Sequence, residues 1–166
     1  AISSKYPPGS TFKLFMAMAG LADKKISPST EMYCPGYYTL GGRAYKCHKH
    51  SGHGAVNLEK AITVSCNAYF YQLGQMLQIG AIERFTGMFG FGSQTGIELP
   101  GEDAGILPSE SWKRKLKNEK WYPGDTIPVS IGQGYLNVTP IQMAVATAAI
   151  ANGGTVFQPY LVKRII

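Results

Sequence analysis

The chain has 166 residues, about the size of one domain, and can bury a hydrophobic core without disulfide bonds. Hydrophobic residues make up 45% of the sequence and charged residues 16%, which excludes a disordered tail. Sixteen Lys and Arg against ten Asp and Glu give a net charge of +6, which suits an anionic partner without identifying one.

The first predicted helix spans Ser10 to Ala22, after an extended stretch that contains Pro7 and Pro8. Its apolar residues cover nearly every face of the helix, so we expect it to be buried. Residues 27–56 are rich in Gly, Pro, Tyr, Cys and His and show no clear periodicity. We expect irregular structure there, with short hairpins.

Two helices joined by a tight turn are predicted next. Asn57 is a favourable cap for a helix from Leu58 to Val64. Three weak helix formers, Ser65-Cys66-Asn67, interrupt the pattern, and a second apolar helix follows over 68–77.

The later part of the chain alternates between helices and loops. A short helix is expected over 81–88, a loop over 90–108 and a basic helix over 109–117. Thr139-Pro140-Ile141-Gln142 is a strong helix start, and that helix should end at 152–154. Residues 155–166 alternate as a strand does.

Lys13 stands out because it lies between Phe12 and Leu14, in a helix without a polar face. Burial lowers the pKa of an ammonium, so Lys13 could act as a base near neutral pH. Ser10 lies three residues earlier, within reach on the helix surface, at the positive end of the helix dipole. This arrangement suits an activated serine nucleophile. Alternatively, Ser10 is an ordinary helix cap and Lys13 extends into water.

The turn formed by Ser65-Cys66-Asn67 could present a hydroxyl and an amide from one edge. Such a pair could relay a proton and hold a substrate amide. The alternative is a plain turn between two helices.

A cluster of metal-binding residue types surrounds this turn in the sequence. Zinc prefers four sulfur or nitrogen ligands in a tetrahedron, and a Cys3His set is available from Cys34, Cys47, His53 and Cys66. The spacings lack the close Cys-x-x-Cys pair of a zinc finger. A disulfide with one free thiol, or three separate buried thiols, would also fit the sequence.

Taken together, the two motifs resemble those of the penicillin-binding protein transpeptidases. The resemblance rests on Tyr6-Pro7-Pro8-Gly9-Ser10-Thr11-Phe12-Lys13 and, some fifty residues later, on Ser65-Cys66-Asn67. It continues through residues 95–102, 124–135 and 138–143. The stretches 35–38 and 121–125 are similar to elongation-type class B members of the family.

The resemblance implies an α/β (α+β) fold of the penicillin-binding protein and serine β-lactamase type. Residues 1–166 would form a partial transpeptidase domain, mostly its helical part, with most of the antiparallel sheet absent. The family's third motif, Lys-Ser/Thr-Gly on a sheet strand, is not found in the sequence. That strand supplies half of the oxyanion hole, so we expect this chain alone to be a weak catalyst.

The resemblance also implies a role for each site residue. Ser10 would attack the penultimate D-Ala carbonyl of a peptidoglycan stem peptide, and an amine of a second stem peptide would take the acyl group. Lys13 would be the base, Ser65 would pass the proton to the departing amine, and Asn67 would hold the donor peptide and assist Lys13. β-Lactams would acylate Ser10 as mimics of the substrate.

The implied partners belong to lateral cell-wall growth. They are stem peptides, β-lactam antibiotics, a cell-elongation glycosyltransferase and scaffold proteins, but no nucleic acid. The expected location is the periplasmic side of a bacterial inner membrane. A membrane anchor would lie outside these residues, since no apolar run here reaches the length of about 18 residues that a span needs. Some elongation-type members hold zinc at positions similar to the four ligands named above, and that zinc would be structural.

Two other functions remain compatible with the sequence. A serine β-lactamase or β-lactam sensor would share Ser10 and Lys13. A zinc-stapled basic module would use the cysteines as structure and the basic helix face, Lys113 to Lys117, to bind nucleic acid. We expect that helix face to be solvated.

Overall fold

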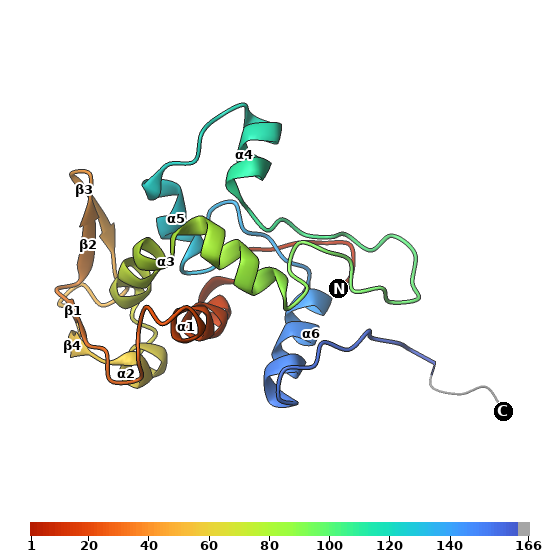
Figure 1. Ribbon diagram of the computed structural model, residues 1–166, viewed down its shortest axis with the longest axis horizontal. Coiled ribbons are helices and arrows are strands. Elements are labelled where there is room, and N and C mark those ends of the chain that lie inside the picture. The colour runs from red at the N-terminus through yellow and green to blue at the C-terminus, as the bar shows by residue number, and fades with distance from the viewer. Residues whose placement is uncertain (163–166) are drawn as a thin grey trace.

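Helix α3 (Asn67–Gly87) runs through the middle of the molecule, and the other elements are arranged around it (Figure 1). The computed structural model describes residues 1–162. Its other helices are the 3-10 turn η1 (Gly9–Phe12), α1 (Lys13–Ala22), α2 (Leu58–Thr63), α4 (Glu110–Lys117), α5 (Pro123–Val129) and α6 (Pro140–Ala151). The strands are β1 (Met32–Cys34), β2 (Tyr37–Leu40), β3 (Arg43–Lys46) and β4 (Gly54–Val56).

The core lies between α1 and α3. The two helices approach closely at Gly20, where a Cβ atom would lie 2.8 Å from the Leu73 side chain. Aromatic rings extend this core: Phe15 packs edge-on against Phe89 and Phe91, with ring centroids 5.2 and 4.9 Å away. The predicted burial of the first helix is therefore confirmed for one side, while Leu14 on the other side is 40% exposed.

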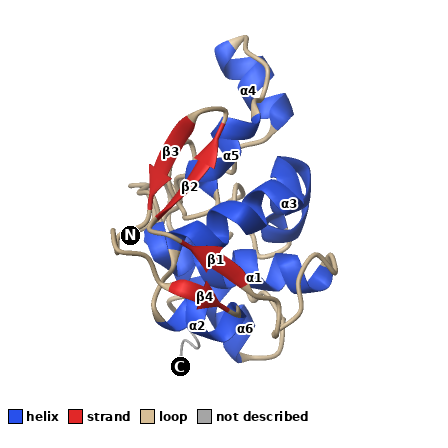
Figure 2. Cartoon of the chain, turned by 90° about the vertical axis from the view of Figure 1, so that its left-hand side faces the viewer, coloured by secondary structure: helices blue, strands red, loops and turns tan. Residues whose placement is uncertain are grey.

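Four short strands form two separate antiparallel pairs at the left-hand end of the molecule in Figure 1, the end that faces the viewer in Figure 2. Strand β1 pairs with β4, so that Cys34 lies opposite Gly54. Strand β2 pairs with β3, with Tyr38 opposite Tyr45. The expected irregular segment thus contains the short hairpins that its composition suggested.

The helix pair around Ser65 agrees with the prediction, whereas the end of the second helix does not. The Asn57 side chain accepts a hydrogen bond from the Lys60 amide and caps α2. The helices expected over 68–77 and 81–88 form one element, α3, with a kink at Gln78 (φ 60°, ψ 166°). Packing of both halves against the core keeps the chain helical on either side of this single non-helical residue.

Two further predictions differ from the structure. Helix α5 was not foreseen, because Gly124 and Pro128 lower its helix propensity. Pro123 at its first position and the Asp125 carboxylate, which accepts from the Tyr122 amide at 2.8 Å, start it nevertheless. The strand expected over 155–166 is wrong for 155–162, which have no strand partner. Residues 163–166 lie outside the described residues.

The basic helix α4 projects from the body of the molecule (Figure 1). The prediction that the basic face of α4 is solvated is wrong for Lys113, which is 2% exposed. The Lys113 ammonium donates to Asp125 at 2.8 Å, lies 3.3 Å from Glu119 and faces the rings of Tyr122 and Tyr135. The hydrogen bond to Asp125 raises the pKa of Lys113, so this residue anchors α4 as a cation.

None of the helices in the described range 1–162 combines the length and hydropathy that a bilayer crossing requires.

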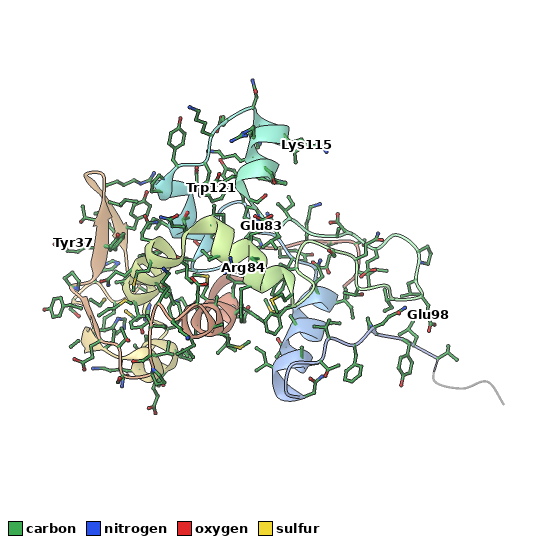
Figure 3. All side chains as sticks on the ribbon, in the orientation of Figure 1. Tyr37, Glu83, Arg84, Glu98, Lys115 and Trp121 are labelled. Carbon is green, nitrogen blue, oxygen red and sulfur yellow. The ribbon has the colours of Figure 1, made fainter. Side chains whose placement is uncertain are left out.

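The Lys113 anchor can be tested by substitution. Lys113→Met leaves the carboxylate of Asp125 without its cation, so we expect the free energy of unfolding to fall by about 1–2 kcal/mol. Lys115 lies on the outer side of the same helix (Figure 3), and Lys115→Met should change it by less than about 0.5 kcal/mol. Urea unfolding of the two variants measures the difference. Equal effects would contradict the assigned role of Lys113.

Candidate functional site

The Lys13 side chain lies inside the molecule, at the start of α1, and is 2% exposed. Its ammonium lies 5.5 Å from the centre of the Phe70 ring. Burial lowers the pKa of Lys13 from its usual range to about 8, although the sulfurs of Cys47 and Cys66 act in the opposite direction. Lys13 therefore loses its proton much more easily than an exposed lysine does.

Three hydrogen bonds fix the Lys13 ammonium. It donates to the Ser65 carbonyl at 2.8 Å, to Ser65 Oγ at 2.9 Å and to Asn67 Oδ1 at 2.6 Å. An ammonium has three N–H donors, and these three acceptors use all of them. A neutral amine has two donors and one lone pair. The carbonyl and the amide oxygen can only accept, so the lone pair of neutral Lys13 would face the Ser65 hydroxyl.

The Ser10 hydroxyl is joined to Lys13 through Ser65. Ser65 Oγ donates to Ser10 Oγ at 3.0 Å, and Ser65 Oγ itself accepts from Lys13. The sequence predicted direct reach between Ser10 and Lys13. In the described residues no direct hydrogen bond joins them, and the Ser65 hydroxyl lies between. Ser10 itself is exposed and faces a hollow of about 420 Å³.

The turn between α2 and α3 holds a strained residue at the centre of this relay. Ser65 has a φ of 50°, a left-handed conformation that costs free energy for a residue other than glycine. The turn is closed by a hydrogen bond from the Cys66 amide to the Ala61 carbonyl at 2.8 Å. Because α2 and α3 are fixed on either side, the turn presents Ser65 and Asn67 to Lys13 together. The predicted turn is confirmed in this respect.

Sequence reasoning missed one element of the site, the loop after α5. The Gly9 amide donates to the Gly132 carbonyl at 2.8 Å, immediately before Ser10. A Cβ atom on Gly132 would lie 2.1 Å from the Gly9 carbonyl oxygen, and the φ of Gly132 is +75°. Only glycine fits this position without displacing the backbone that carries Ser10. The dense glycines of 132–134 were the available signal.

The three cysteines and His53 lie close together behind the Ser65 turn, which is one of the arrangements that the sequence left open. Their sulfur atoms and one His53 nitrogen lie within 4.8 Å of one another, and His53 Nδ1 is 3.5 Å from Cys34 Sγ and 3.6 Å from Cys47 Sγ. The ligands of a tetrahedral Cys3His zinc site lie about 3.6 Å apart, as the usual bond lengths require. All three thiols are free. The residues therefore fit a zinc ion.

The surroundings of the cluster also set the protonation states of its possible ligands. Burial raises the pKa of the Cys66 thiol to about 12. Burial, with positive charges nearby, lowers the pKa of His53 and favours the neutral imidazole that a metal needs. A bound cation would offset the cost of a buried thiolate at Cys66.

Comparison with known proteins identifies relatives over the whole chain. Residues 1–166 match the family described as penicillin binding protein transpeptidase domain. The peptidoglycan D,D-transpeptidase MrdA of Acinetobacter baumannii is 42% identical over 165 residues, which are 98% of this chain and 25% of that protein. The chain thus spans about a quarter of the length of this curated relative.

Solved structures agree with this match. PBP2 of Pseudomonas aeruginosa superimposes with a TM-score of 0.95 at 42% identity, over 98% of this chain and 36% of that one. PBP2 of Helicobacter pylori, in a complex with MreC, gives a TM-score of 0.92 at 36% identity, over 96% of this chain and 30% of that one. The predicted fold class, the mostly helical part of a transpeptidase fold, is confirmed.

The environment of Lys13 predicts its titration. In the full-length protein, nuclear magnetic resonance of labelled lysine side chains should show one residue with a pKa of about 8, because desolvation destabilises its ammonium. That signal should disappear in Lys13→Met and remain in Lys25→Met, which changes an exposed lysine. A Lys13 signal that titrates near 10.5, as exposed lysines do, would contradict the assigned environment.

Proposed function

Because the chain belongs to the penicillin-binding protein transpeptidase domain family, we propose that it supplies the nucleophile of a peptidoglycan D,D-transpeptidase. The observation that carries the proposal is the continuous relay from Ser10 through Ser65 to the buried amine of Lys13. A buried amine with a lowered pKa, joined by hydrogen bonds to an exposed hydroxyl, is what activation of a serine requires.

The proposed acylation begins when neutral Lys13 receives a proton. Ser10 Oγ attacks the penultimate D-Ala carbonyl of the stem peptide, and its proton passes to Ser65 as the Ser65 proton passes to Lys13. The carbonyl carbon then bonds to Ser10, the C–N bond to the terminal D-Ala breaks, and the proton returns through Ser65 to the departing amine. The relay therefore serves first as base and then as acid.

Asn67 is suited to two tasks at once. Its side-chain oxygen accepts from Lys13, which leaves both amide hydrogens available. We assign these hydrogens to a backbone carbonyl of the donor peptide. The same contact would orient the peptide and hold Lys13 in place.

The acyl group on Ser10 would be transferred to an amine of a second stem peptide. This releases Ser10 and forms the cross-link. A β-lactamase would instead need a carboxylate or similar base to activate water. None of the described residues that line the hollow in front of Ser10 is Asp or Glu. The match of the whole chain to the transpeptidase domain family favours the transpeptidase over the β-lactamase alternative.

We infer the partners of this protein from those of its relatives. PBP2 of Helicobacter pylori has been solved in a complex with MreC. By analogy, the protein would act with a scaffold protein and a glycosyltransferase of cell elongation, on the periplasmic side of the inner membrane, where stem peptides are exposed. β-Lactams would acylate Ser10 as substrate mimics.

We also propose that Cys34, Cys47, His53 and Cys66 hold a structural zinc ion. When bound, zinc would cross-link the β1–β4 region to the turn that carries Ser65 and Asn67. Four protein ligands leave no coordination position for water, so no chemical role follows. The chain itself places Cys66 in the turn and the other three ligands behind the turn.

The proposed nucleophile can be tested with penicillin. The full-length protein should form one stoichiometric adduct, located at Ser10 by mass spectrometry, and Ser10→Ala should form none. Lys13→Met should slow acylation about 10²- to 10⁴-fold, the usual contribution of a general base, while Lys25→Met should not. An adduct elsewhere would contradict the proposal, and rapid turnover of a cephalosporin would favour a β-lactamase.

The proposed zinc ion can be tested by elemental analysis and thermal unfolding. We expect one zinc per chain in the full-length protein, and a melting temperature that falls by about 5 °C or more when a chelator removes it. His53→Asn should lose the metal, whereas His50→Asn, an exposed histidine outside the cluster, should keep it. Zinc near zero together with a Cys34–Cys47 disulfide would overturn the proposal.

A further inference from the structure

A second hollow, of about 330 Å³, lies between the β2–β3 hairpin and helix α5. In Figure 2 the hairpin lies in front of α5, at the end of the molecule that faces the viewer. Small-molecule sites in proteins begin at about 300 Å³, so the hollow can hold a group the size of an amino acid. No residue that we have assigned to the relay or to the thiol cluster lines it.

The hollow is connected to the candidate active site along two segments. Tyr71, in its wall, lies four residues after Asn67 on α3 and therefore on the same side of that helix. Gln133, also in its wall, directly follows Gly132, whose carbonyl accepts from the Gly9 amide next to Ser10. The hollow therefore borders the two segments that hold Asn67 and Ser10 in place.

Tyrosine rings form the walls and are fixed in place. The rings of Tyr45 and Tyr71 lie 6.0 Å apart, and the Tyr71 hydroxyl donates to the Lys46 carbonyl at 3.3 Å. On the α5 side, Gly124 leaves space for the Tyr45 hydroxyl, which would lie 3.2 Å from a Cβ at that position. Rigid aromatic faces of this kind pack well against the aliphatic part of a peptide side chain.

The charge available in the hollow is positive. The Arg43 guanidinium lies over the Tyr45 ring, 5.1 Å from its centre, and forms no ion pair within residues 1–162. Asp125 is the carboxylate in the lining, but its Oδ2 accepts from both Lys113 and the Tyr122 amide. The charge of Asp125 is thus compensated, whereas that of Arg43 is free to bind a carboxylate in bidentate fashion.

We propose that this hollow is a subsite for a carboxylate-bearing residue of the stem peptide, with Arg43 as the residue that recognises the carboxylate. This inference rests on the proposed function, because the peptide must reach the hollow from Ser10. It goes further by assigning a specificity-determining role to the β2–β3 hairpin, which lies outside the Ser10 relay. Arg43 would select acidic stem peptides over their amidated counterparts.

The test compares two synthetic stem peptides that differ only in an internal carboxylate or carboxamide. Their dissociation constants are measured on the full-length protein, on Arg43→Gln and Arg43→Lys, and on Arg114→Gln as a control with an exposed arginine of α4. We expect the unmodified protein to prefer the carboxylate peptide about three- to tenfold, the range for a partly exposed ion pair. Arg43→Gln should abolish the preference, Arg43→Lys should keep part of it, and Arg114→Gln should keep it fully.

Two outcomes would overturn the inference: equal affinity of the unmodified protein for both peptides, or an unchanged preference in Arg43→Gln. The binding measurement does not depend on catalysis. Penicillin labelling of the same unmodified sample reports separately on the proposed function. If penicillin fails to label the protein but the Arg43-dependent preference for the carboxylate peptide is preserved, the transpeptidase assignment is wrong and the carboxylate site stands.

Discussion

The candidate active site depends on the buried ammonium of Lys13. Lys13 lies in an apolar helix, where a charge is unfavourable, and it is tolerated because one turn supplies acceptors for all three of its donors. The same burial lowers the pKa of Lys13 to about 8. The cost of placing a charge inside the core and the chemical usefulness of that charge therefore have one physical origin.

This arrangement requires the Ser65 turn to be held firmly, since Ser65 adopts a left-handed conformation. Three distant parts of the chain contribute. Helices α2 and α3 fix the ends of the turn, the cluster around Cys66 supports it from behind, and Gly132 positions the backbone of Ser10 on the opposite side. The hairpins, which carry little of the core, thus contribute to the order of the site.

The features that sequence predicted well are those set by local chemistry. A lysine within an apolar helix, the Asn57 cap and the Thr139–Gln142 capping box depend on neighbours a few residues away, and each is present. Features set by tertiary partners were missed. In the sequence Lys113 looks like a solvated lysine, and its burial depends on the contact with Asp125. Residues 155–162 alternate like a strand but have no strand partner. The need for glycine at position 132 arises only from its contact with Gly9. The Ser65 bridge between Ser10 and Lys13 depends on a contact across 55 residues, which helix spacing cannot reveal.

The central claim is that neutral Lys13 takes the proton of Ser10 through Ser65. The most direct measurement is the second-order rate constant of penicillin acylation of the full-length protein as a function of pH. Because the base is the neutral amine, the rate should rise with pH and level off above an inflection near pH 8, the pKa of Lys13. A rate that is independent of pH between about 6 and 10, or an inflection at the usual lysine pKa of about 10.4, would contradict the account.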